Sequence, residues 1–67
     1  MSIRNVICVM VANNNFGFVE GAEYKMDLKT RCIIKGEEEW RAVVEDCGDI
    51  YIYSSDTMKT IAVFEFN

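Results

Sequence analysis

Short apolar runs separated by glycines and polar turns divide the chain into five or six segments. Ile3 to Val11 is rich in Val and Ile, which favour strands, and it is followed by three asparagines, which favour turns. A second strand is predicted around Ala22 to Leu28, after Gly21, and a last strand over Met58 to Phe66. The pattern therefore predicts a mainly β chain.

A hairpin is predicted in the middle of the chain, where Thr30 to Lys35 and Glu38 to Glu45 flank a possible two-residue turn. Gly36 suits the first central position of a type II′ turn, because that position requires a positive φ. The resulting register pairs Lys35 with Glu38 and Ile33 with Trp40. Both pairs are favourable, one ionic and one between an aromatic and a β-branched side chain.

A second hairpin is predicted over residues 43–53, which read VVEDCGDIYIY. Gly48 can take the positive φ that its acidic turn requires. Alternation along Ile50 to Tyr53 places the two isoleucines on one face of the strand and the two tyrosines on the other. We expect one pair in the core and the other pair more exposed.

Residues 37–47 also allow a helical interpretation, because apolar positions recur at helical spacing before Gly48. The positions concerned are Trp40, Val43, Val44 and Cys47. A helix would place Glu45 and Asp46 at the negative end of its dipole, and alternation of Trp40, Ala42 and Val44 favours a strand. We prefer the strand, and the alternative is an α+β fold.

Length and composition set further bounds. A chain of 67 residues forms a single domain, residues 1–67, whose core is only just large enough for stability. Self-association would add buried apolar surface, so a homodimer is possible. The apolar run near the start is too short for a signal peptide, and no stretch approaches a membrane span, so a cytoplasmic location is expected.

The net charge of −4 makes nucleic acid an improbable partner, because binding to phosphate backbones depends on clustered Lys and Arg. Cys8, Cys32 and Cys47 are widely spaced, and the chain has no histidine, so we expect no metal site. In a reducing cytoplasm these thiols are expected to be small buried hydrophobic groups.

Catalytic chemistry is not expected either. The sequence lacks a histidine base, a nucleophile elbow and the glycine-rich phosphate or dinucleotide loops. The carboxylates cluster in turns, where they are more simply explained as solvated turn residues. We therefore predict no enzymatic activity, no catalytic residue and no cofactor.

The candidate binding residues are aromatic and acidic. Exposed tyrosines on a strand are typical of interface hot spots, and a second aromatic group could lie near them. The acidic residues suggest complementarity to a basic patch on a partner. The candidate protein-binding residues are Phe16, Trp40, Tyr51, Tyr53, Glu37, Glu38, Glu39, Glu45, Asp46 and Asp49.

The order of these parts resembles that of short bacteriophage-encoded SH3-like small barrels. The resemblance lies in the initial strand VICVMV, the entry GAEYKM after an Asn-rich loop, the hairpin VVEDCGDIYIY and the terminal VFEF. It implies an antiparallel barrel of five or six strands that binds a bacterial host protein and modulates or inhibits it. Two other classes stay open: a nucleic-acid-binding barrel and an oligomeric structural component.

Overall fold

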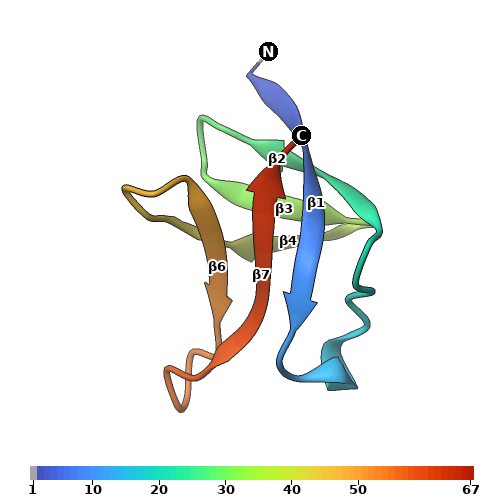
Figure 1. The fold of residues 1–67 in the computed structure, drawn as a ribbon, viewed down its shortest axis with the longest axis vertical. Helices are drawn as coiled ribbons and strands as arrows, with labels where there is room; N and C mark the ends of the chain where they lie inside the picture. Colours follow the sequence, from blue (N-terminus) through green and yellow to red (C-terminus); the bar gives the residue numbers. More distant parts are fainter. Residues whose placement is uncertain (1) are drawn as a thin grey trace.

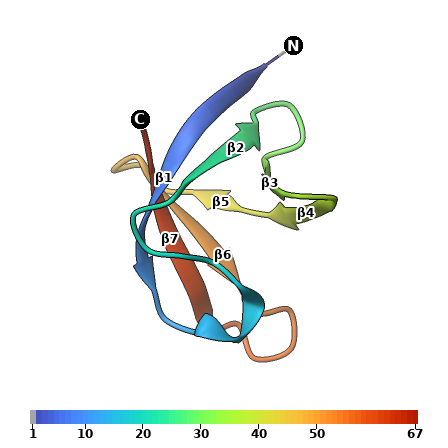
Figure 2. The same ribbon diagram turned by 90° about the vertical axis from the view of Figure 1, so that its right-hand side faces the viewer.

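Seven strands form one antiparallel sheet in the computed structural model, which describes residues 2–67. The strands are β1 (Ile3–Val11), β2 (Glu23–Asp27), β3 (Cys32–Lys35), β4 (Glu38–Arg41), β5 (Val43–Val44), β6 (Asp49–Tyr53) and β7 (Thr60–Phe66). Their order in the sheet is β4-β3-β2-β1-β7-β6-β5. The chain is thus a meander whose first and last strands pair, and the sheet curls into a nearly closed barrel (Figures 1 and 2).

The mainly β, antiparallel barrel expected from the sequence is confirmed, with seven strands in place of five or six. The additional strand arises because the predicted strand over Glu38 to Glu45 is interrupted at Ala42. The backbone N–H of Ala42 donates to the carbonyl oxygen of Arg31 at 2.9 Å, and the chain then leaves β3 to pair with β6. The two edges of the sheet, β4 and β5, are therefore consecutive in sequence but unpaired with each other.

The helix considered for residues 37–47 is wrong, because β4 and β5 use their backbone groups in pairing with β3 and β6. Side chains alternate along this segment as a strand requires. Ala42 is 4% exposed, and Trp40 and Val44 pack against the core, whereas Arg41 and Val43 are exposed.

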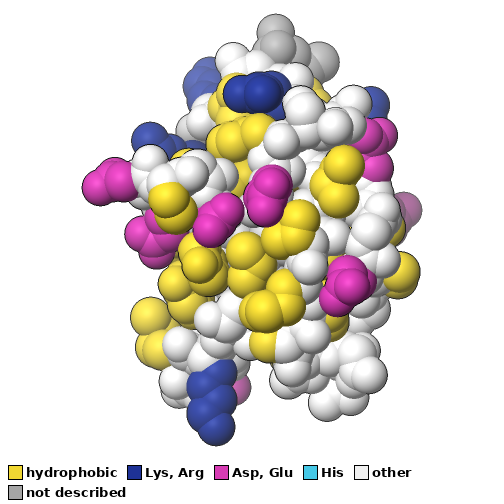
Figure 3. Space-filling model, viewed as in Figure 1, with side chains coloured by type: hydrophobic (Ala, Val, Ile, Leu, Met, Phe, Trp, Pro, Cys, Tyr) yellow, Lys and Arg dark blue, Asp and Glu magenta, His cyan; other side chains and the backbone are white. Residues whose placement is uncertain are grey.

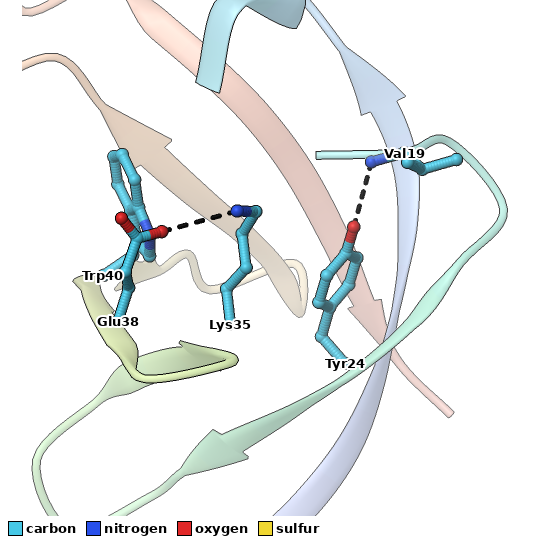
Figure 4. Close-up of polar contacts among 5 residues, drawn as sticks. All are labelled: Val19, Tyr24, Lys35, Glu38 and Trp40. Carbon is cyan, nitrogen blue, oxygen red and sulfur yellow. Dashed lines mark hydrogen bonds and ion pairs between the residues drawn. The ribbon is translucent and has the colours of Figure 1, made fainter. Parts of the chain in front are cut away.

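The predicted β3–β4 hairpin is confirmed in its register, with Ile33 opposite Trp40 and Lys35 opposite Glu38. Gly36 has a φ of +61°, and Glu37 keeps a negative φ, which agrees with a type II′ turn. The Lys35 ammonium lies 3.4 Å from a Glu38 carboxylate oxygen in an exposed ion pair of modest value (Figure 4). Local turn chemistry therefore set this register.

The core is filled from the inward positions of the strands and from one residue of the β1–β2 connection, Phe18. Its ring is 4% exposed and makes edge-to-face contacts with Tyr24, Trp40 and Phe64, at centroid distances of 5.6, 5.2 and 5.6 Å. The Tyr24 hydroxyl accepts a hydrogen bond of 2.9 Å from the backbone N–H of Val19 (Figure 4). This bond holds the connection over the barrel, so Phe18 acts as a plug.

Strand β7 begins at Thr60, two residues later than predicted, because Met58 takes a left-handed φ of +58° in the β6–β7 turn. A side chain in this conformation costs about 1–2 kcal/mol, whereas glycine adopts it freely but has more unfolded-state entropy. Met58 is 71% exposed, so little packing is lost on its removal. Met58→Gly is expected to raise the free energy of unfolding in urea by up to about 1 kcal/mol.

The neighbouring substitution Lys59→Gly is the matched control, because Lys59 has no positive φ. It is expected to lower stability, because glycine adds unfolded-state entropy at a position that has no left-handed strain to relieve. Equal effects of the two substitutions would contradict the assignment of strain to Met58.

The three cysteines differ in exposure, and the expectation that all are buried is wrong for Cys47. Cys8 is buried, Cys32 is half-buried, and Cys47 is exposed on the β5–β6 turn, where its thiol donates to an Asp49 carboxylate oxygen at 3.6 Å. Burial raises the pKa of the Cys8 thiol, which keeps it protonated and unreactive at neutral pH. Cys47 is exposed because it lies in the turn between β5 and β6, outside the strands.

A thiol reagent at pH 8 is therefore expected to label Cys47 first, Cys32 more slowly and Cys8 only after unfolding. Mass spectrometry of the labelled chain over time measures the three rates. Cys47→Ser is expected to remove the fast phase and leave the others unchanged. Labelling of Cys8 in native buffer at the rate of Cys47 would contradict the burial described above.

Candidate protein-binding surface

The outer face of β5, β6, β7 and β1 carries a continuous apolar row. Val43 lies opposite Tyr51, Tyr51 opposite Val63, and Val63 opposite Met10, so these four side chains share one side of the sheet. Val43 is 46% exposed and Met10 43% exposed. Figure 3 shows apolar side chains gathered over β6, β7 and β1. We call this surface the tyrosine face, formed by Met10, Val43, Tyr51, Tyr53 and Val63. Val63 is only 7% exposed and forms its floor between Tyr51 and Met10.

The two tyrosines lie where alternation along β6 predicts. Ile50 and Ile52 are 0% and 1% exposed and point into the core, whereas Tyr51 and Tyr53 are half-buried on the outside. Their rings stack, with centroids 5.8 Å apart and planes 8° from parallel. Partial desolvation, and then the charge of Asp49, raises the pKa of the Tyr51 phenol, so its hydroxyl is a hydrogen-bond donor at neutral pH.

An acidic border lies beside the tyrosine face. Asp49 lies opposite Glu65, two residues along each strand from the pair Tyr51 and Val63. Glu45 and Asp46 lie in the β5–β6 turn that precedes Asp49. Figure 3 shows carboxylates adjoining the apolar patch. Within residues 2–67 the one ion pair joins Lys35 to Glu38, so none of these carboxylates is in an ion pair, although Arg31 lines the same hollow as Glu45 and Asp46. We call Glu45, Asp46, Asp49 and Glu65 the acidic border.

The six acidic residues proposed from the sequence do not form one surface. The β3–β4 turn, which carries Glu37, and the β5–β6 turn, which carries Glu45 and Asp46, lie on opposite sides of the barrel (Figure 1). Glu38 is also occupied, because it accepts from the Lys35 ammonium and from Trp40 Nε1, each at 3.4 Å (Figure 4). Residues 37–39 are thus separate from the tyrosine face.

Three of the proposed aromatic residues meet around a hollow of about 290 Å³. Phe16 comes from the short 3-10 helix η1 (Asn14–Phe16), Trp40 from β4 and Tyr53 from β6. The rings of Phe16 and Trp40 are 5.5 Å apart at 79°. Glu39, Arg41 and Asp56 are the charged residues of its lining. We call this site the aromatic hollow, and Tyr53 links it to the tyrosine face.

Sequence reasoning missed four residues of this surface: Met10, Val43, Val63 and Glu65. Their exposure or pairing depends on the long-range register of β1 with β7 and of β7 with β6. No local signal in the sequence fixes that register. The run of apolar residues in VFEF and VICVMV gave only the strands themselves.

In the described part of the chain no group of three His, Cys, Asp or Glu residues is placed to hold a metal ion. No helix among residues 2–67 is long and apolar enough to cross a membrane.

Comparison with known proteins gives no match: no family model fits the chain, and no curated protein or solved structure is significantly similar to it. The tyrosine face, the acidic border and the aromatic hollow are therefore the features from which a function is inferred.

Proposed function

We propose that this chain is a non-enzymatic binding domain that attaches to a partner protein through the tyrosine face. The observation that carries the proposal is the row Val43, Tyr51, Val63 and Met10, which places apolar groups of four strands on one side of the sheet, with Val43 and Met10 exposed, Tyr51 half-buried and Val63 covered between its neighbours. Exposed apolar patches rimmed by polar residues mark interaction sites in soluble proteins. Tyrosine is among the residues that contribute most to interface hot spots.

The acidic border supports the proposal because its like charges lower the stability of the sheet. Asp49 and Glu65 are directly opposite each other on neighbouring strands, and like charges in this position destabilise a sheet. Residues that destabilise the fold, and whose cost no interaction within the fold offsets, are candidates for function. A basic group on a partner would supply the compensation.

The partner proposed here is a protein with an apolar surface bordered by Lys or Arg. The net charge of −4 favours such a partner, because complementary charge speeds association and sets orientation. The resemblance to phage-encoded small barrels implies that the partner is a bacterial host protein, modulated or inhibited in the host cytoplasm. That element of the proposal rests on analogy of pattern, and the surface chemistry does not depend on it.

The experiment that tests this function is affinity capture from nuclease-treated bacterial lysate with three forms of the tagged chain. These are the wild type, the double variant Tyr51→Ser with Tyr53→Ser, and the control Val19→Ser. Val19 is 59% exposed on the β1–β2 connection, outside the tyrosine face, so its variant matches the loss of apolar surface. One stoichiometric protein should be retained by the wild type and the control and lost from the double variant.

Retention of that protein by all three forms would overturn the assignment of the tyrosine face. Sedimentation of the purified chain supplies the other decisive outcome. If the wild type is a stable dimer that the double variant converts to monomer, the face joins copies of this chain, and the proposal of a host partner fails.

A further inference from the structure

We propose that the aromatic hollow binds an organic ammonium group, presented either by a small quaternary amine or by a lysine side chain. The inference goes beyond the proposed function and does not depend on it, because the hollow can bind a free cation when the tyrosine face is unoccupied. Three observations carry it: the aromatic walls, their fixed orientation and the charges at the rim.

The walls are three rings from three different elements. Phe16 and Trp40 stand nearly perpendicular, at 79° with centroids 5.5 Å apart, and Tyr53 borders the same hollow from β6. The face of an aromatic ring is negative, and a cation within about 6 Å of its centroid is attracted to it. The volume of about 290 Å³ lies at the lower limit of ligand pockets, so the site suits one chemical group rather than a large molecule.

The Trp40 wall is held in place before any ligand binds. The Trp40 indole N–H donates to Glu38 at 3.4 Å (Figure 4), and its ring packs on Phe18 at a centroid distance of 5.2 Å. Outside the hollow, Lys35 Nζ lies 5.8 Å from the centroid of the Phe18 ring, the ring on which Trp40 packs. A preorganised site loses less free energy on binding than one that must be ordered.

The rim carries two carboxylates, Glu39 and Asp56, and one guanidinium, Arg41, so its formal charge is −1. Neither carboxylate takes part in an ion pair within residues 2–67. A cation in the hollow is therefore attracted by Glu39 and Asp56 and repelled by Arg41. This arrangement predicts effects of opposite sign for the removal of an acid and the removal of the base.

The test titrates the purified full chain with choline and with its uncharged carbon isostere 3,3-dimethyl-1-butanol. Trp40 is the single tryptophan of the chain and lines the hollow, so its fluorescence reports on this site while the chain stays folded. We expect saturable binding of choline with a Kd at least about tenfold below that of the isostere, since two or three cation–π contacts supply that difference. Sodium chloride at matched ionic strength is the blank.

A second pair of probes distinguishes the two sources of the cation. The probes are Nα-acetyl-lysine-N-methylamide and its uncharged analogue Nα-acetyl-norleucine-N-methylamide. If the lysine compound binds more tightly than the norleucine compound, the site is assigned to a lysine side chain. If only choline binds more tightly than its uncharged analogue, the site is assigned to a small quaternary amine. Either result supports the proposal. If neither cation binds more tightly than its uncharged analogue, the proposal is overturned.

Rim variants make the assignment to this hollow specific. Glu39→Gln should weaken choline binding by about threefold and Arg41→Gln should strengthen it by a similar factor, as expected for unit charges several ångströms away in water. Glu37→Gln, outside the lining, should have no effect. Phe16→Leu should reduce the preference for the cation, because one of the three rings is lost, and its urea unfolding curve verifies that it is folded. Shifts of the same sign for the two rim variants would contradict a cation in the hollow.

Discussion

Phe18→Ala is expected to lower the free energy of unfolding by about 3–5 kcal/mol, the usual cost of removing a buried phenylalanine. Phe18 is 4% exposed and contacts the rings of Tyr24, Trp40 and Phe64. A domain of this size has roughly 3–10 kcal/mol of stability in total, so much of the population should unfold. Urea unfolding followed by Trp40 fluorescence measures the loss.

The matched control is Phe16→Ala, which removes the same side chain two positions earlier. Phe16 is 36% exposed and has one ring contact, with Trp40, so a loss of about 1 kcal/mol is expected. Similar losses for the two variants would show that the β1–β2 connection does not plug the barrel.

The role of Phe18 could not be read from the sequence. Phe16 and Phe18 are two positions apart next to Gly17, a spacing that suggests entry into a strand. The structure instead places Phe16 in a 3-10 turn and Phe18 in irregular chain, held by the bond between Tyr24 and Val19. Which of the two rings enters the core depends on the path of a loop, and loop paths are set by tertiary packing.

The hairpins were predictable because their information is local. Gly36 and Gly48 both take the positive φ that their turns require, and the pairs Ile33–Trp40 and Lys35–Glu38 follow from the turn length. The closure of the barrel was not predictable in the same way. It depends on pairing between β1 and β7, which are separated by nearly the whole chain and contain a register shift between Cys8 and Met10.

The candidate site was also predictable only where the information is local. Alternation in Ile50 to Tyr53 was sufficient to place both tyrosines outside, because period 2 is a local property. The neighbours that turn them into a surface, Val63 and Met10, come from strands whose register is long-range. The acidic residues were wrongly grouped for the same reason, since proximity in sequence does not place two turns on one side of a barrel.

Tyr51→Ser and Tyr53→Ser are each expected to weaken binding of the captured partner by at least about 30-fold, the effect of a hot-spot loss of about 2 kcal/mol. Both rings lie on the exposed face of β6, and neither fills the core, so both variants should remain folded. Isothermal titration calorimetry with the purified partner measures the affinity, and circular dichroism verifies the fold. Val19→Ser is again the control, with an expected change below about twofold.

The double variant tests whether the two rings act together. Their rings stack with centroids 5.8 Å apart, so removing one ring also removes the packing that orients the other. The loss of binding free energy in the double variant should therefore be smaller than the sum of the losses in the single variants. Additive losses would mean that the partner contacts each ring independently.

Charge variants then separate the two acidic regions. Neutralising Glu45, Asp46 and Asp49 together should slow association and flatten its salt dependence, because these residues adjoin the tyrosine face. Neutralising residues 37–39 should change neither quantity, since their turn lies on the opposite side of the barrel (Figure 1). If residues 37–39 proved the more important set, the partner would have to reach the β3–β4 turn, and the binding surface would centre on the aromatic hollow instead of the tyrosine face.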